Sequence, residues 1–401
     1  MNLRLVKNIN YMVLAQAANY ALPLLLIPYL VRTLGLGGFG DFSVAQSIIS
    51  VGLILVQFGF NIYVTKDIAE KTAKGRAIDE VISATFSFQI VLAVVLMVLV
   101  SVVYAFHPGR VAQLSLWYSF AWLGQALFPV WYFQGTQSFK QLAGLNFALR
   151  ASTFVLVLAF IKGEEHLLFL PMIYSFSYIS TGVYACRIMW RRHAWHLPTV
   201  RELLSLAINS KDVFVSSMVS VMLMNMPVLF LSHQVSKEEV GALSAILRVI
   251  YAIKGMFNSG FQVLIPVLIS ERNRLDHRRI VLKVLLIVAL IVTVAMLLKE
   301  PFLAALYGQQ AVFNNDLEYF VLCFSVIPGA LATLCVLVFA TYYGDFTLRK
   351  RAFMWTLVIT GVLYYPSIHL LNGLGAALTF LIGETTLLIL GYRVVRNNPV
   401  G

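Results

Sequence analysis

The chain has 401 residues, of which 60% are hydrophobic and only 12% are charged, and its mean hydropathy is +0.82. A soluble domain is about one quarter charged, so this composition excludes an ordinary soluble enzyme and indicates an integral membrane protein. The net charge of +12 would suggest nucleic acid as a partner of a soluble protein, but in a membrane protein the positions of the charges matter more than their sum, and we expect no nucleic acid partner.

Apolar runs recur from end to end of the chain, and each is long enough to cross the hydrocarbon core of a membrane as a helix. The runs are continuous and do not alternate with period two, which favours helices over a transmembrane barrel. The sequence therefore predicts an all-α membrane protein with about 12 transmembrane helices. The predicted spans are 10–31, 42–64, 79–105, 113–133, 142–161, 166–189, 209–232, 240–269, 281–298, 318–343, 352–371 and 374–394.

The basic residues outside these spans are distributed unevenly. Twenty-two Lys and Arg residues fall on the side of the chain termini and five on the other side. The positive-inside rule then places both termini in the cytoplasm, with the lipid bilayer and its anionic leaflet as the ordinary partner of this charge. Three basic residues, Arg150, Arg248 and Lys254, lie inside predicted spans.

The first two predicted helices each carry a stripe of polar side chains on one face. In lipid such a face must contact protein or water. Two interpretations stay open, namely hydrogen bonds between helices and the wall of a hydrated cavity. The residues are Gln16, Asn19, Tyr20 and Pro23 in the first helix, and Gln46, Ser50, Gln57 and Asn61 in the second.

The connection between these helices contains Gly35, Gly37 and Gly40 at the spacing of a dinucleotide-binding fingerprint. A membrane helix precedes these glycines where that fingerprint needs a strand, so the pattern does not indicate a nucleotide site. Glycine permits backbone conformations that other residues avoid, and the sequence predicts a tight turn at the outer surface.

A weaker copy of this first unit appears 201 residues later in the chain. The copy needs no gap and has the same place in the topology, which predicts a parallel repeat and hence two pseudo-symmetric six-helix lobes. We expect an N-terminal lobe over 1–190, a cytoplasmic amphipathic linker over 191–208 and a C-terminal lobe over 209–401. The matching residues are Gly40, Ser43, Gly59, Phe60, Ile68 and Glu70 with Gly241, Ser244, Gly260, Phe261, Ile269 and Glu271.

The expected linker joins the two lobes on the cytoplasmic side. Thr199 and Glu202 have capping-box spacing, and the leucines that follow predict a short amphipathic helix at the membrane interface. His193 and His196 are predicted to be solvated and not to bind a metal.

Buried charge is the strongest chemical signal in the sequence. Three cations lie deep in predicted spans, but Glu384 is the one convincing deep acid. A charge in lipid costs at least about 2.5–3.5 kcal/mol, so the excess cations need water or an anionic ligand. Arginine offers a forked donor geometry that suits phosphate. The alternative is that Arg150 or Arg248 extends to the membrane surface.

The N-terminal motifs resemble the signature of bacterial O-antigen and polysaccharide repeat-unit flippases, in the multidrug/oligosaccharidyl-lipid/polysaccharide exporter superfamily. The segment Trp131-Tyr-Phe-Gln134-Gly135 is similar to that family's segment after helix 4, whereas Gln137 stands where many relatives carry an acidic residue. The signature consists of Gln16, Asn19, Tyr20 and Pro23, Pro28-Tyr-Leu-Val-Arg32, Leu34-Gly35, Gly38-Phe-Gly40, Ala45-Gln46, Phe58-Gly-Phe-Asn61 and Thr65-Lys-Asp-Ile-Ala69.

The resemblance implies a two-lobed transporter without catalytic residues or bound cofactor. It would move an undecaprenyl-pyrophosphate-linked oligosaccharide across the bacterial inner membrane by alternating access, coupled to a proton or sodium gradient. Glu384 is the candidate coupling group, and polymerase and chain-length proteins of the same pathway are candidate partners. The candidate substrate-binding residues are Arg32, at the signature's basic position, with Arg150, Arg248, Lys254, Asn19, Gln46, Gln57 and Asn61.

Two alternatives stay open. A membrane-embedded polymerase or glycosyltransferase of the same pathway would need paired carboxylates or a large external loop, and the longest predicted outer connection is only Lys299 to Asn315. A lipid-linked peptidoglycan-precursor flippase is separated from our interpretation only by the N-terminal signature. A drug or cation exporter is disfavoured because it should bury more carboxylate than cation.

Overall fold

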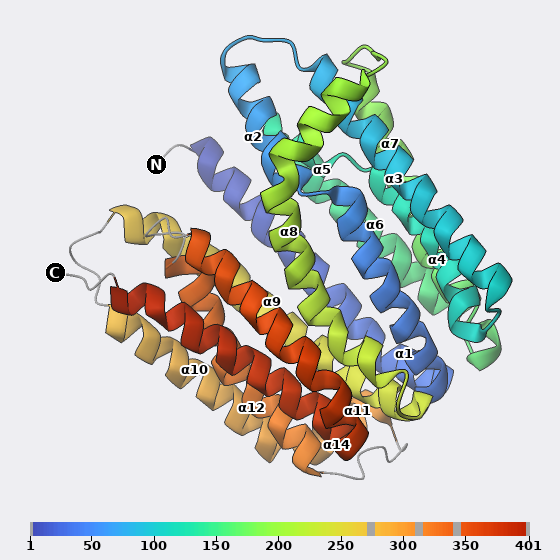
Figure 1. Cartoon of the computed structure of the whole chain (residues 1–401), viewed down its shortest axis with the longest axis vertical. Coiled ribbons are helices and arrows are strands. Elements are labelled where there is room, and N and C mark those ends of the chain that lie inside the picture. The colour runs from blue at the N-terminus through green and yellow to red at the C-terminus, as the bar shows by residue number, and fades with distance from the viewer. Residues whose placement is uncertain (1–2, 271–276, 309–315, 340–345, 398–401) are drawn as a thin grey trace. The chain divides into compact units, whose positions relative to one another are not determined.

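The computed structural model describes residues 3–270, 277–308, 316–339 and 346–397, and every regular element among them is a helix (Figure 1). Side chains are described over 22–257, 261, 281–308, 316–336 and 349–393. The helices are α1 (Leu3–Gln57), α2 (Phe60–Ala73), α3 (Asp79–Phe106), α4 (Arg110–Ala126), α5 (Val130–Gly135), α6 (Phe139–Phe160), the 3-10 helix η1 (Glu164–His166), α7 (Phe169–Trp190), α8 (Val200–Leu231), α9 (Lys237–Ser270), α10 (His277–Leu297), α11 (Lys299–Tyr307), α12 (Asp316–Thr333), the π-helix η2 (Leu334–Phe339) and α14 (Phe346–Asn397).

Seven of the described helices are long and apolar enough to cross a membrane, or eight if the pair Val281–Leu297 and Lys299–Tyr307, bent by 74°, is one span. Two of them, Leu22–Ala73 with 52 residues and Arg349–Arg393 with 45, can each cross twice, because one crossing needs about 20 residues. A residue outside helical geometry divides each of them, Gly35 in α1 and Asn372 in α14. The sequence places a boundary between two spans at both positions.

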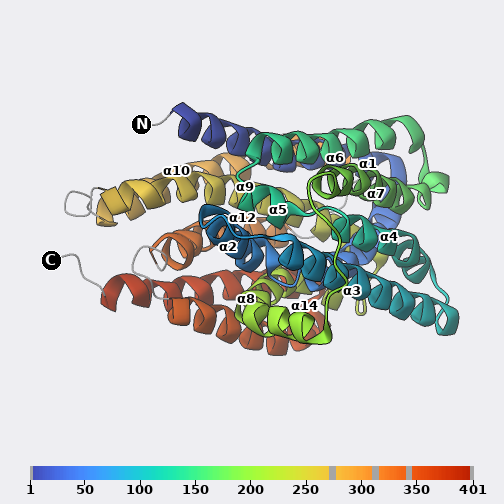
Figure 2. The ribbon, with the colours of Figure 1, turned by 90° about the horizontal axis from the view of Figure 1, so that it is seen from above.

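Contacts group the chain into two compact units. Unit 1 comprises Met1–Pro23 and Asp41–Asn225, and unit 2 comprises Leu24–Gly40 and Met226–Gly401. In unit 1, α4 packs between α3 and α7, and α6 also packs on α7 (Figure 1). In unit 2, α12 packs against α9, α10 and α14, and Figure 2 shows α12 and α14 side by side. The lobe boundaries at 190 and 208 stay a prediction.

The glycine-rich turn is narrower than the sequence predicts. Gly35 alone leaves helical geometry inside α1, with φ 67° and ψ 169°. Gly37 and Gly40 are helical and pack on the first turn of α9, where a Cβ on Gly40 would lie 2.0 Å from the carbonyl oxygen of Lys237. Two of the three glycines therefore permit a close approach of two helices within unit 2.

The linker between the predicted lobes ends in the expected capping box. The backbone N–H of Thr199 donates to the Glu202 carboxylate at 2.7 Å, and the Glu202 N–H faces the Thr199 hydroxyl at 3.3 Å. The separate short helix predicted after it is wrong, because α8 runs on without interruption to Leu231. Glycine is absent from this stretch and its one proline is Pro227, so nothing ends the helix near residue 208.

Candidate functional site

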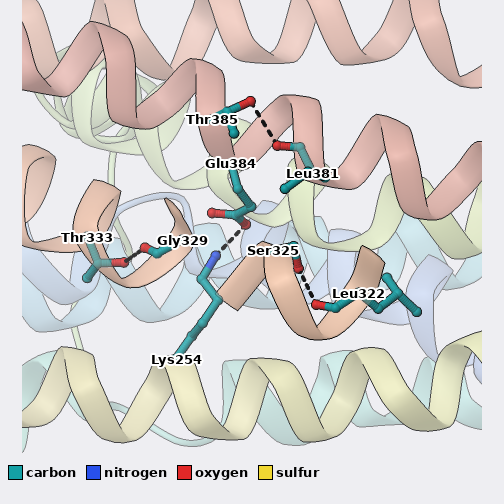
Figure 3. Close-up of polar contacts among 8 residues, drawn as sticks. All are labelled: Lys254, Leu322, Ser325, Gly329, Thr333, Leu381, Glu384 and Thr385. Carbon is teal, nitrogen blue, oxygen red and sulfur yellow. Dashed lines mark hydrogen bonds and ion pairs between the residues drawn. The ribbon is translucent and has the colours of Figure 1, made fainter. Parts of the chain in front are cut away.

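A buried ion pair in unit 2 joins two of the residues selected from the sequence. The Lys254 ammonium of α9 contacts Glu384 Oε1 of α14, and the two side chains are 21% and 8% exposed (Figure 3). The lysine Nζ also lies 5.8 Å from the centroid of the Phe380 ring, in cation–π geometry. The pair neutralises both charges in a part of the protein where either alone would be costly.

Glu384 is the only charged residue in the buried class among the described residues. Its second carboxylate oxygen, Oε2, is buried and has no hydrogen-bond partner in the described part of the chain. Gly329 of α12 makes room for this group, because a Cβ there would lie 2.9 Å from Oε2 and 3.3 Å from Lys254 Cε. Gly329 therefore leaves free the space that the carboxylate occupies beside α12.

Arg248 lies on α9, and its side chain is half-buried. Its guanidinium carbon lies 4.7 Å from the centroid of the Phe39 ring, which is completely buried. A guanidinium can stack on an aromatic face and still direct N–H donors toward an anion, since its five donors lie in the plane of the group. This position is compatible with the predicted anion-binding role and does not test it.

Arg32 of α1 is engaged with backbone carbonyls at the end of α11. One guanidinium nitrogen, Nη2, donates to the carbonyl oxygen of Ala304 at 3.2 Å and also to that of Ala305. A cation at this position satisfies acceptors that the helix end leaves free and complements the helix dipole. Arg32 thus has a structural role in unit 2, and substrate binding by it stays a prediction.

Arg150 and the polar stripes lie mainly in unit 1. Arg150 is half-buried on α6, and the side chain of Asn19 lies outside the described residues. Gln46 Nε2 lies 3.3 Å from the Tyr118 hydroxyl of α4. Asn61 Nδ2 donates to Gln57 Oε1 at 3.1 Å. The stripe of the second predicted helix thus makes hydrogen bonds inside the protein, which is one of the two interpretations left open. The other interpretation, that its amides line a cavity, stays a prediction.

Sequence reasoning missed one polar cluster at the linker. His193 Nδ1 lies 2.6 Å from Asp79 Oδ1, and Nε2 lies 3.3 Å from the Tyr132 hydroxyl. The histidine side chain is only 15% exposed, so the prediction of a solvated residue is wrong. The acid at the N-terminus of α3 was the one available signal, and it does not identify its partner 114 residues away.

The family model described as "Polysaccharide biosynthesis protein" matches residues 5–272, which is more than half of the chain. The chain belongs to this family. A protein of Escherichia coli (strain K12) described as an O-antigen transporter is 25% identical to this family member over 99% of this chain and 98% of its own length. A protein of Shigella dysenteriae with the same description is 27% identical over 40% of each chain.

Solved structures of membrane transporters share the fold of this family member. A structure of the lipid II flippase MurJ in an inward closed conformation superposes with a TM-score of 0.76 at 11% identity, over 98% of this chain and 87% of MurJ. An inward-facing multidrug resistance MATE family transporter of the MOP superfamily gives a TM-score of 0.66 at 15% identity, over 93% and 97% of the two chains. The predicted fold class, an all-helical membrane protein with about 12 transmembrane helices in two lobes, is confirmed.

Proposed function

We propose that this family member is a flippase that moves an undecaprenyl-pyrophosphate-linked oligosaccharide, an O-antigen or related repeat unit, across the bacterial inner membrane by alternating access. The O-antigen transporter of similar length and the MurJ-like fold support a transporter of lipid-linked glycans over an enzyme. Both chain termini would lie in the cytoplasm.

The observation that carries the proposal is that the buried carboxylate of Glu384 is paired with a lysine. The one charged residue that is buried among the described residues, Glu384, already has Lys254 as its counter-ion. A drug or cation exporter would need a buried carboxylate that is free for its passenger. Two further cations, Arg150 and Arg248, lie half-buried on membrane helices, and their forked guanidinium donors suit an anionic passenger such as a pyrophosphate.

The proposed ligands of the pyrophosphate are the four cations Arg32, Arg150, Arg248 and Lys254. The amides of Asn19, Gln46, Gln57 and Asn61 are proposed as contacts of the glycan. Transport is proposed to be coupled to a proton or sodium gradient, with Glu384 as the coupling group. Collapse of each gradient by a selective ionophore in proteoliposomes would show which ion is used.

A leaflet assay tests the proposal. Protein reconstituted in liposomes should move a fluorescent polyprenyl-pyrophosphate-linked sugar to the opposite leaflet, where a membrane-impermeant quencher detects it. The mass of the lipid should stay the same, whereas a polymerase or glycosyltransferase would change it.

Lys254→Ala and Arg150→Ala should stop transport and surface polysaccharide display while the protein still inserts. Lys66→Ala, at a lysine side chain that is 77% exposed, is the matched control. Normal transport by both the Lys254→Ala and the Arg150→Ala protein would contradict the proposed site.

A flippase for a peptidoglycan precursor is the second candidate, because MurJ gives a TM-score of 0.76. At 11% identity this likeness shows the fold alone. The two candidates differ in the glycan, so the same leaflet assay with both lipid-linked sugars in one liposome separates them. Preferential movement of lipid II would favour the second candidate.

A further inference from the structure

Lys254 takes part in two interactions, one proposed and one seen in the structure. Its ammonium is the proposed ligand of an anionic headgroup, and in this structure it is bound to Glu384. An ammonium is a compact point charge, and two anions cannot both approach it closely in a low-dielectric surrounding without repelling each other. A headgroup phosphate and Glu384 are therefore rivals for the same lysine.

The Glu384 carboxylate is not held by the three hydroxyls that lie beside it in Figure 3. Each of them donates to a carbonyl of its own helix. Ser325 donates to Leu322 at 2.6 Å, Thr333 to Gly329 at 2.8 Å and Thr385 to Leu381 at 3.0 Å. Oε2, in a side chain that is 8% exposed, accepts no hydrogen bond from the described residues. Desolvation offsets most of the Coulomb attraction in a buried ion pair, and a carboxylate oxygen without a hydrogen bond adds to that cost.

The helix that faces the pair is also irregular. α12 contains Pro328 directly before Gly329, and five residues after Gly329 the helix widens into the π-helix Leu334–Phe339. Proline removes one backbone hydrogen bond, and π-helical turns recur at functional sites. The wall beside Lys254 and Glu384 is thus built from backbone that departs from regular α-helix, which suits a site where side chains exchange partners.

We propose that Glu384 is an internal competitor for the anionic headgroup at Lys254. When no headgroup is bound, the Glu384 carboxylate pairs with the Lys254 ammonium. A bound phosphate displaces the carboxylate, and return of the carboxylate helps to expel the phosphate. Glu384 would thereby keep the affinity for the headgroup low enough for release. The inference rests on the proposed function, since it needs Lys254 to be a headgroup ligand.

Binding of farnesyl pyrophosphate to the full-length protein in lipid nanodiscs, with farnesol as the uncharged probe, tests the inference. Glu384→Gln removes the competing charge and should tighten binding roughly tenfold, which corresponds to about 1.4 kcal/mol. Glu300→Gln removes the same charge from an exposed glutamate of unit 2 and should change nothing. In the Lys254→Ala background, Glu384→Gln should give no tightening, because the competition acts through the lysine.

Unchanged or weaker binding by Glu384→Gln, together with weaker binding by Lys254→Ala, would overturn the competitor role and leave the proposed function intact. Equal tightening with and without Lys254 would also overturn it. Equal affinity of the unaltered protein for farnesyl pyrophosphate and farnesol would instead contradict the proposed function. If Glu384→Gln does not fold, Glu384→Asp shortens the reach to Lys254 and should tighten binding by a smaller factor.

Discussion

Gly40 and Gly241 lie against the backbones of each other's helices in a reciprocal contact. A Cβ on Gly40 would lie 2.0 Å from the carbonyl oxygen of Lys237, and a Cβ on Gly241 would lie 2.1 Å from that of Leu36. Gly40 and Gly241 are 201 residues apart, and so are Leu36 and Lys237. Equivalent positions of the proposed repeat thus make equivalent contacts, as a two-fold relation between two copies requires.

Alanine at either glycine should destabilise unit 2. A methyl group at 2.0–2.1 Å from a carbonyl oxygen forces the helices apart, and we expect a loss of about 1–3 kcal/mol for each variant. The double variant should lose less than the sum, since one displacement relieves both clashes. Thermal unfolding in detergent measures this. Gly144→Ala, at an exposed helical glycine with no atom within 4 Å of the new methyl group, is the control and should not destabilise. Additive losses would show that the two contacts are independent.

Arg32→Met should lower the melting temperature of the protein, because the carbonyl oxygens of Ala304 and Ala305 lose their donor. We expect a cost of about 1 kcal/mol, since methionine keeps the apolar part of the side chain. Lys162→Met is the matched control, because that exposed lysine lies just after α6 and donates to the carbonyl of Leu158, only four residues earlier in the chain. A normal melting temperature with weaker binding of farnesyl pyrophosphate would instead assign Arg32 to the substrate.

The Trp131 indole N–H donates to Gln89 Oε1 at 3.0 Å, and both residues are at most 1% exposed. Gln89→Leu should cost about 1–3 kcal/mol, because it leaves a buried donor without an acceptor. Gln89→Leu combined with Trp131→Phe should recover part of this cost, since the orphaned donor is then also absent. The free energy of unfolding of the three variants checks the coupling, and a fully additive double variant would contradict it.

The pair of His193 and Asp79 should protect the linker from proteases. Asp79→Asn removes the charge that faces the imidazole at 2.6 Å, and we expect trypsin to cut after Arg191 or Arg192 roughly fivefold faster. The neighbouring exposed acid offers a control, Glu80→Gln, which should leave the rate unchanged. Equal rates for all three proteins would show that other contacts hold the linker.

The sequence predicts where the chain crosses the membrane better than it predicts which residues meet. The boundary between spans 352–371 and 374–394 coincides with the break at Asn372, because the hydropathy pattern records each crossing locally. The sequence predicts Glu384 as a deep acid for the same reason.

Contacts between distant residues leave no such local record. The partner of Glu384 is 130 residues away in the chain, and a carboxylate in an apolar run does not identify its counter-ion. The sequence predicts a turn at the glycines after Gly35. A glycine is compatible with either a turn or a close approach of two helices, and only the packing on α9 distinguishes the two.

The sequence separation of Lys254 and Glu384 also determines the order in which the two residues enter the membrane during synthesis. The lysine enters the membrane with α9, whereas its carboxylate is synthesised 130 residues later, in the last described helix. Until α14 inserts, the membrane holds a lysine that lacks this counter-ion, at a cost of about 2.5–3.5 kcal/mol. The arrival of α14 removes that cost, so unit 2 gains part of its stability only after α14 has inserted. A chain cut before α14 would therefore keep Lys254 in the bilayer without this counter-ion.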